Sequence, residues 1–251
     1  MSQIPSFVRL SLVSLAASLF AVSASGQLTT NLTATAQGFY DDFEGSNRPS
    51  GTAYTVGSFS GLTLHNFFVF DRSTDPLLKF VEIHKATLEL YIPADIFDPS
   101  YFSSDLNDTG ALFSLYKFDG NLTSLKDGLG GAAAFADLGA DAGGTFGTRT
   151  VSSADNVPGT LISIDLSAYF LTYINALSGE FALGGALSNP NDTPLPEDFE
   201  FMFGSSNDAP LANLRLEFVA VPEPSTYGLI GAAALGLLVW RRRSVKAVRK
   251  S

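Results

Sequence analysis

Residues 86–92 read Ala-Thr-Leu-Glu-Leu-Tyr-Ile, and this stretch indicates the fold class more clearly than any other part of the chain. Apolar and polar side chains alternate along it, with the apolar ones at Ala86, Leu88, Leu90 and Ile92. Because successive side chains of a strand point to opposite faces, this alternation is typical of a half-buried strand in an antiparallel sheet.

The same alternation recurs along the chain, most clearly at Leu214, Leu216 and Phe218. Further predicted strands cover residues 66–70, 111–118, 160–166, 180–187 and 200–203. Turn-rich stretches at 128–147 and 189–196 lie between them. Only residues 167–177 have helical spacing, with Phe170, Tyr173, Ile174 and Leu177 three or four residues apart. The sequence therefore predicts an all-β, antiparallel β-sandwich of about eight strands with one short helix.

The order of these segments resembles a known architecture. A strand ending near Phe70, a long strand from Ile83 to Tyr91, and a passage from strand to helix between Ile162 and Leu171 are similar to jelly-roll modules of bacterial surface proteins. Those modules are related to carbohydrate-binding modules. The resemblance implies a jelly-roll-like ectodomain over residues 27–219.

The composition suits a single packed domain. The chain has 251 residues, of which 45% are hydrophobic and 16% charged. Setting aside two apolar terminal segments leaves about 190 residues, enough to build one core. Cysteine is absent, which excludes a disulfide framework, thiol catalysis and thiolate metal sites.

The charge is distributed unevenly. Between residue 10 and residue 240 there are eight basic residues and all 25 acidic ones, a net charge of −17. Such a surface repels phosphates, so we expect neither nucleic acid nor anionic lipid as a partner of the ectodomain. It attracts cations, calcium included.

The amino-terminal segment has the order of a secretory signal peptide. Arg9 precedes the apolar run 10–22, which the small residues 23–26 follow. The run spans roughly 20 Å as a helix, less than the roughly 30 Å hydrocarbon core of a bilayer. Residues 1–26 are therefore predicted to be a signal peptide cleaved after Ala24 or Gly26, with an uncleaved anchor as the alternative.

The carboxy-terminal segment predicts a membrane span. No charge interrupts residues 227–240, and Arg241, Arg242 and Arg243 follow directly. Basic residues stay on the cytoplasmic side, so the ectodomain is expected outside and the basic tail 241–251 inside.

The residues around this span carry a second resemblance. The linker 220–226 contains the sequence Val221, Pro222, Glu223, Pro224, Ser225. Followed by a Gly/Ala/Leu-rich helix and three arginines, it resembles the PEP-CTERM sorting signal. The resemblance implies recognition by an exosortase, cleavage near Pro222 to Pro224, and export to the bacterial cell envelope or extracellular matrix. A plain tail anchor with a rigid linker is the alternative.

No motif predicts catalysis. His65 and His84 are the only histidines, 19 residues apart in or beside predicted strands, and we expect both on strand surfaces. The chain is therefore not expected to be an enzyme.

Acidic clusters suggest a structural calcium ion as the one candidate cofactor. The candidate ligands are carboxylate and amide oxygens at Asp41, Asp42, Glu44, Asp105, Asn107 and Asp108. Asp71 with Asp75 forms a further acidic pair. Asp and Asn are equally typical of solvated turns, so the alternative is that these residues serve the backbone.

Three functions fit the sequence to different degrees. The first is a non-enzymatic envelope or matrix protein with a structural or adhesive ectodomain. The second is a carbohydrate-binding module for extracellular polysaccharide, which needs an exposed aromatic platform. The candidate platform residues are Tyr40, Tyr54, Tyr91, Tyr101 and Tyr116. The third, a secreted hydrolase, lacks a nucleophile motif.

Overall fold

The computed structural model describes residues 27–43, 53–59, 61–92, 111–152, 155, 157–188, 200–203, 210–219 and 233. The predicted signal peptide, sorting motif, basic tail and, apart from residue 233, membrane span lie outside these residues. Residues 27–218 form one compact unit. This unit is the predicted ectodomain.

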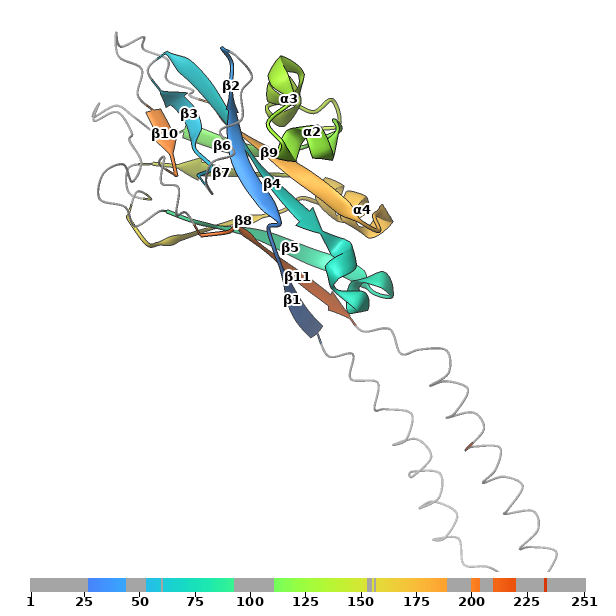
Figure 1. Ribbon diagram of the computed structural model, residues 1–251. Coiled ribbons are helices and arrows are strands. Elements are labelled where there is room, and N and C mark those ends of the chain that lie inside the picture. Colours follow the sequence, from blue (N-terminus) through green and yellow to red (C-terminus); the bar gives the residue numbers. More distant parts are fainter. Residues whose placement is uncertain are drawn as a thin grey trace, which may run out of the picture. The chain divides into compact units, whose positions relative to one another are not determined.

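Two antiparallel sheets make up the compact unit (Figure 1). The four-stranded sheet has the order β1 (Gln27–Thr33), β11 (Asn213–Val219), β5 (Glu82–Tyr91) and β8 (Leu161–Asp165). The larger sheet has the order β10 (Glu200–Met202), β3 (Val56–Phe59), β4 (Leu62–Asp71), β9 (Glu180–Ser188), β6 (Ala111–Lys117) and β7 (Gly147–Val151). Strand β2 (Ala36–Asp41) also pairs with β4. The all-β, antiparallel prediction is confirmed.

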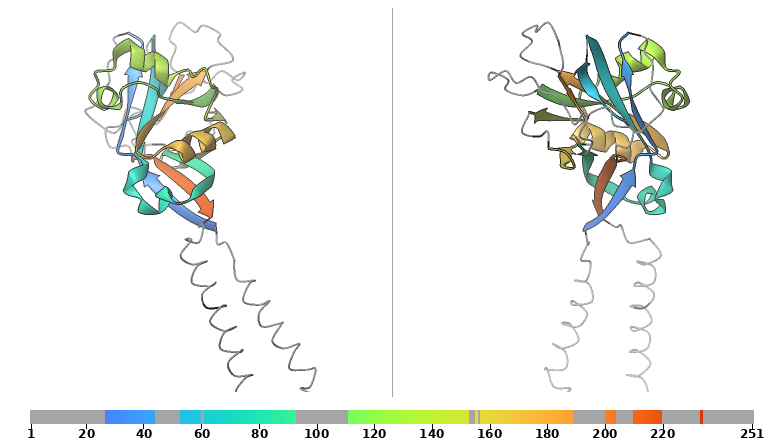
Figure 2. Two further views of the ribbon diagram at one scale, coloured as in Figure 1. Left: turned by 90° about the vertical axis from the view of Figure 1, so that its right-hand side faces the viewer. Right: turned by 60° about the vertical axis from the view of Figure 1, so that its left-hand side comes forward.

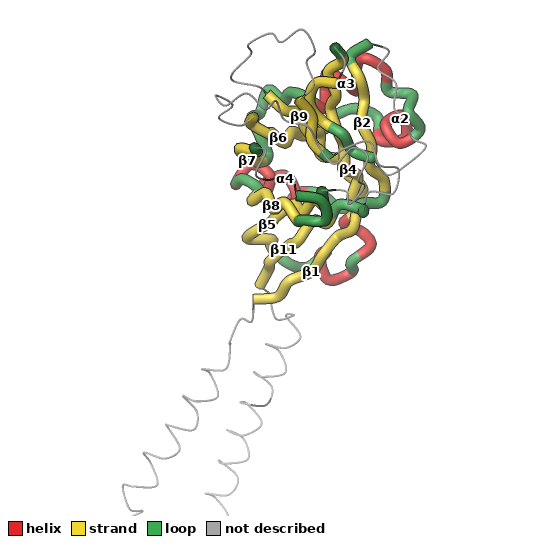
Figure 3. Tube along the Cα trace, turned by 90° about the vertical axis from the view of Figure 1, so that its left-hand side faces the viewer, coloured by secondary structure: helices red, strands yellow, loops and turns green. Residues whose placement is uncertain are grey.

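The main core lies between the two sheets. On β5 the predicted inward residues Ala86, Leu88 and Leu90, together with Ile92 just after the strand, are at most 1% exposed. They belong to one apolar cluster with Phe68 of β4 and with residues of β6 and β9 from the other sheet. The sheets therefore face each other across a shared core, as the tube in Figure 3 and the two views in Figure 2 also show.

The chain passes from one sheet to the other between β1 and β2. Ala34 N donates to Ala212 O in the four-stranded layer at 2.9 Å, and Thr35 N donates to Val69 O of β4 at 2.7 Å. The buried Gln37 side chain spans the same corner, since it donates to Pro210 O at 3.2 Å and accepts from the Ala212 amide at 2.9 Å. These hydrogen bonds connect the β1–β2 link to the segment that leads into β11.

Strand β4 is buried on both faces. Phe68 and Phe70 point into the main core, whereas Phe67 and Val69 belong to a second cluster with Leu138. Two helices supply the cover on this outer side, α2 (Leu122–Lys126) and α3 (Gly131–Leu138). The run of apolar residues in β4 follows from its two-sided burial.

Helix α3 corrects the sequence prediction, which assigned residues 128–147 to turns and allowed one helix only. The glycines of this stretch favour turns, but Ala132 to Ala134 favour a helix. An isolated helix of this length is marginal in water. It is stable here because Ala134 and Leu138 bury against the outer face of the sheet. The predicted helix α4 (Ala168–Ala176) is confirmed, with Ser167 as its N-cap.

A buried arginine joins three elements. Arg72 begins the short helix η1 (Arg72–Thr74), which precedes η2 (Pro76–Lys79). Its guanidinium donates to Ile174 O at 2.5 Å and Leu177 O at 2.8 Å, at the carboxyl end of α4, and to Leu78 O at 2.5 Å. Burial lowers the pKa of this guanidinium, but an arginine stays charged under all ordinary conditions. The positive charge of Arg72 is stabilised by hydrogen bonds to these three carbonyl oxygens.

Arg72 is therefore expected to contribute strongly to stability. Arg72→Met removes the guanidinium donor from three carbonyls, of which Ile174 O keeps a 3.3 Å hydrogen bond from the Leu177 amide. We expect this variant to lower the free energy of unfolding by about 3 kcal/mol. Lys126→Met, which removes the exposed 3.0 Å pair with Glu180, is the control and should cost under about 1 kcal/mol. Urea denaturation of residues 27–222 measures both. Equal losses in the two variants would contradict the role assigned to Arg72.

Candidate functional site

The predicted sorting segment, Val221 to Ser225, lies outside the described residues, as do Arg241, Arg242 and Arg243. The strand that leads into it is described. β11 ends at Val219 and is a central strand, with β1 on one side and β5 on the other. The segment therefore starts shortly after a strand that is held along both edges.

Burial anchors this last strand. Leu214, Leu216 and Phe218 alternate along β11 and are at most 1% exposed, which confirms the predicted pattern. All three belong to the core that the two sheets share. Truncating a buried leucine of this kind costs about 2–5 kcal/mol. Without β11, moreover, β1 loses the strand that pairs it to the rest of the described four-stranded sheet.

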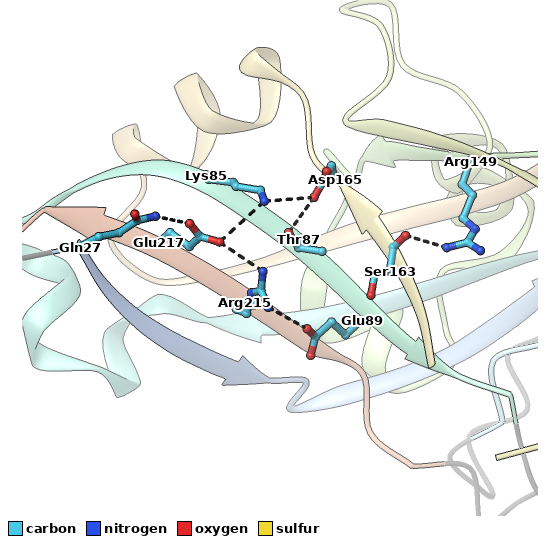
Figure 4. Close-up of polar contacts among 9 residues, drawn as sticks. All are labelled: Gln27, Lys85, Thr87, Glu89, Arg149, Ser163, Asp165, Arg215 and Glu217. Carbon is cyan, nitrogen blue, oxygen red and sulfur yellow. Dashed lines mark hydrogen bonds and ion pairs between the residues drawn. The ribbon is translucent and has the colours of Figure 1, made fainter. Parts of the chain in front are cut away.

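The outer face of the same sheet carries a row of alternating charges (Figure 4). Lys85 of β5 lies 3.9 Å from Asp165 of β8 and 3.8 Å from Glu217 of β11. Arg215 of β11 lies 3.2 Å from Glu217 and 3.8 Å from Glu89 of β5. Such partly exposed pairs are individually weak, at about 0–1 kcal/mol each. They align β11 with its neighbours, while the core residues beneath supply most of the stability.

Both ends of the compact unit meet at one end of this sheet. The Gln27 side-chain amide donates to the Glu217 carboxylate, and Thr33 Oγ1 donates to Asn213 Oδ1 at 3.0 Å. β1 is therefore antiparallel to β11, and its first residue lies beside the end of β11. The predicted signal peptide ends immediately before β1 in sequence, so both predicted processing points are close in sequence to the same end of one strand pair.

The candidate calcium ligands are only partly described. Asp41 is buried at the end of β2, whereas Asp42 is exposed and accepts a hydrogen bond from the Thr63 amide at 3.0 Å. Glu44, Asp105, Asn107 and Asp108 lie outside the described residues. Among the residues that the structure does describe, no three acidic or histidine side chains gather at metal-binding distance. The calcium site stays a prediction.

Asp71 and Asp75 serve the backbone. Asp71 accepts from the Ser73 amide at 2.8 Å at the start of η1. Asp75 accepts from the Leu77 amide at 2.9 Å at the start of η2, and from Thr30 Oγ1 at 2.8 Å. Both are helix N-caps, the role in which aspartate satisfies an otherwise unbonded amide.

The two histidines have different surroundings. His84 is exposed, beside Lys85, where the alternation of β5 is interrupted between the buried Ile83 and Ala86. His65 was also predicted on a strand surface, which is wrong, because α3 covers that face of β4. Its ring stacks on Phe135 with centroids 4.1 Å apart, and its Nδ1 lies 2.8 Å from Phe135 O.

This packing affects the protonation of His65. Burial lowers the pKa of the imidazole, and the hydrogen bond to the Phe135 carbonyl and the charge of Asp42 oppose that effect only in part. A side chain at Gly139 would collide with the ring, since a Cβ there would lie 2.0 Å from His65 Cε1. His65 is therefore packed between β4 and α3.

The candidate tyrosines do not form one platform. Tyr40 and Tyr54 are fully buried. The Tyr40 hydroxyl donates to Leu125 O at 3.0 Å, and the Tyr54 hydroxyl donates to Tyr91 O at 2.5 Å. Tyr91 and Tyr116 are half-buried on strands of opposite sheets, and Tyr101 lies outside the described residues. Burial removes two of the five from any sugar-binding role.

Comparison with protein-family models matches residues 220–243 to the PEP-CTERM protein-sorting motif. The chain carries a PEP-CTERM sorting motif. The matched residues start directly after β11 and include all of Val221 to Ser225 and Arg241 to Arg243. Comparison with curated proteins gave no match.

The PEP-CTERM motif indicates how this chain is exported and sorted. It marks a protein that is exported and sorted at a membrane, with an exosortase as its processing partner. Every helix among the described residues is too short or too polar to traverse a bilayer. The predicted span 227–240 lies outside those residues, apart from Ala233.

The position of the PEP-CTERM motif after a central strand predicts how far the chain can be shortened. Residues 27–222 keep the whole of β11, so we expect a single cooperative urea transition. Residues 27–212 lack β11, which opens the middle of the four-stranded sheet, and we expect no cooperative transition. Circular dichroism during urea titration distinguishes the two. A folded 27–212 chain would contradict the anchoring role of β11.

The lowered pKa of His65 predicts a pH-dependent stability. The unfolded chain takes up the proton first, at a pKa of about 6.5, so the free energy of unfolding should fall as the pH drops through that value. His65→Gln removes this contribution and should flatten the profile between about pH 7.5 and pH 5.5. His84→Gln replaces the other histidine, which is exposed, and is the matched control. A His65→Gln profile identical to that of the wild type would contradict the prediction.

Proposed function

We propose that this chain is a non-enzymatic protein of the bacterial cell envelope or extracellular matrix, whose acidic β-domain has a structural or adhesive role. The observation that supports it is the place of the PEP-CTERM motif, directly after a central strand. A cut near Pro222 to Pro224 leaves every described strand of the domain intact. The exosortase reaction therefore releases a finished domain.

The proposal includes a jelly-roll arrangement of the ectodomain. Apart from β2, β3 and β10, the described strands form sheets of order β1-β11-β5-β8 and β4-β9-β6-β7. Successive strands alternate between the two sheets except at β6 and β7, which is close to the connectivity of two interleaved Greek keys. The antiparallel registers support this arrangement.

The proposed route has four steps that the terminal segments specify. Residues 1–26 direct export and are removed. Residues 227–240 hold the chain in the inner membrane, and the arginines at 241–243 keep the tail on the cytoplasmic side. The exosortase cuts near Pro222 to Pro224, where the prolines keep the segment extended. The domain then passes to the envelope or matrix.

A catalytic function finds less support. His65 is packed under Phe135, and His84 lies on the other sheet. The carbohydrate-binding alternative also lacks support, because Tyr40 and Tyr54 are buried and Tyr91 and Tyr116 belong to opposite sheets. Binding to extracellular polysaccharide in a pull-down would revive that alternative.

Intact-mass analysis of the exported protein tests the proposal. The mature chain should begin after Ala24 or Gly26 and end near Pro222 to Pro224. Replacing Arg241, Arg242 and Arg243 by Gln should reduce the processed fraction, because the orientation of the span depends on these charges. Arg249→Gln, farther from the span, is the control and should be processed normally. A mature chain that retains residues 241–251 would contradict the proposal.

A further inference from the structure

Three segments converge at the end of the four-stranded sheet from which the chain continues to residue 220. Gln27 of β1 bonds Glu217 of β11, and Lys85 of β5 lies 3.8 Å from the same carboxylate. The beginnings of β1 and β5 therefore flank the end of β11. Helices η1 and η2, which directly precede β5, lie at this end as well (Figures 1 and 2).

This end of the domain exposes large apolar side chains. Phe80 is 78% exposed, Leu77 is 61% exposed and Leu28 is 43% exposed. The Thr30 hydroxyl on β1 bonds Asp75, which caps η2 by accepting from the Leu77 amide. Leu28 and Leu77 thus belong to neighbouring elements, and we call Leu28, Leu77 and Phe80 the apolar end patch.

The turn that presents the patch is fixed from inside. Leu78 is fully buried, and its carbonyl accepts a 2.5 Å hydrogen bond from Arg72. The Phe80 amide donates to Leu77 O at 3.2 Å. With Leu78 held inward, Leu77 and Phe80 are held outward. Scattered exposed leucines are common on protein surfaces, but here a phenylalanine and a leucine are held outward on the same turn.

The short linker between β11 and the predicted membrane span limits how far the patch can lie from the bilayer. Residues 220–226 separate β11 from the predicted span, and seven extended residues reach at most about 25 Å. Whenever residues 227–240 are in the bilayer, the end of β11 is therefore held within that distance of the lipid surface. The patch lies at this end of the domain.

We propose that the apolar end patch rests on the outer lipid surface while the chain is tethered, an inference that depends on the proposed insertion of residues 227–240. Phenylalanine and leucine partition into the interfacial region of a bilayer. The exposed Lys79 lies between Leu77 and Phe80 in sequence, and its stem can extend to the headgroups. Glu82, two residues after Phe80, is also exposed, and its negative charge offsets the positive charge of Lys79. Because the patch then has no net charge to attract anionic lipid, we take a zwitterionic lipid surface as its partner.

Tryptophan fluorescence tests this contact, because Trp240 is the only tryptophan of the chain. The chain from Gln27 to Ser251 is reconstituted into phosphatidylcholine vesicles whose acyl chains carry bromine near the headgroups. The reporter variant carries Phe80→Trp in a Trp240→Phe background. The matched control variant carries Leu129→Trp in the same background, since Leu129 is 76% exposed in the turn between α2 and α3.

The expected result is strong quenching and a blue shift of the reporter variant, with the control variant unquenched. Adding Leu77→Ser to the reporter variant should reduce the quenching, because the patch loses part of its apolar surface. Equal quenching of the reporter and control variants would contradict a contact specific to the patch.

Three other outcomes separate the contact from the insertion on which it depends. An unquenched reporter variant, together with quenched Trp240 in the wild-type chain, would overturn the membrane contact and leave the proposed insertion standing. Unquenched Trp240 in the wild-type chain would overturn the insertion itself. A blue shift of the reporter variant without lipid quenching would show that the introduced tryptophan lies in an apolar environment that is not lipid. The patch would then contact a second copy of the chain, which also overturns the proposal.

Discussion

The structure depends on the insertion of its last strand into the middle of a sheet. β11 lies between β1 and β5 in the described four-stranded sheet. β1 therefore has no partner strand in this sheet until β11, the last described strand, has paired with it. The alternating residues Leu214, Leu216 and Phe218 then complete the core between the sheets. This closure is non-local, because it joins the first and last strands of the compact unit 27–218. The PEP-CTERM motif follows β11 directly in sequence, so a cut within the motif leaves this last strand whole.

Polar ties fix the parts that the main core does not reach. Arg72 binds the end of α4 to η2 through carbonyl oxygens, and Gln37 fixes the corner where the chain crosses between the sheets. The Tyr40 hydroxyl connects β2 to α2. Each of these side chains is buried and makes hydrogen bonds, although Arg72 Nε has no partner among the described residues, and a buried polar group without partners is costly. These ties specify positions that apolar packing alone would leave open.

Charge and apolar surface are separated in a way that suits an exported domain. The outer face of the four-stranded sheet carries paired charges from Lys85 to Glu89, and the sequence between the terminal segments is acidic. The end near Leu77 and Phe80 adds exposed apolar side chains beside the charged Lys79 and Glu82. An acidic body resists binding to phosphate-rich surfaces, whereas a small apolar end can touch lipid without charge attraction. This arrangement suits the proposed tethering through residues 220–226 and the proposed cut near Pro222 to Pro224.

The strand class and the sorting function can be predicted without coordinates, because both depend on local patterns: the alternation of residues 86–92 and the order of residues 220–243. Only the tertiary structure decided which strands are neighbours, since hydrogen bonding between strands joins residues far apart in the chain, as for β1 and β11. It also decided that α3 is a helix and that His65 is packed, because a short glycine-flanked helix is stable only against the sheet that it covers. The burial of Tyr40 and Tyr54 could not be predicted from the sequence either. An aromatic residue on or beside a strand has the same local sequence pattern whether it faces solvent or another layer of the structure.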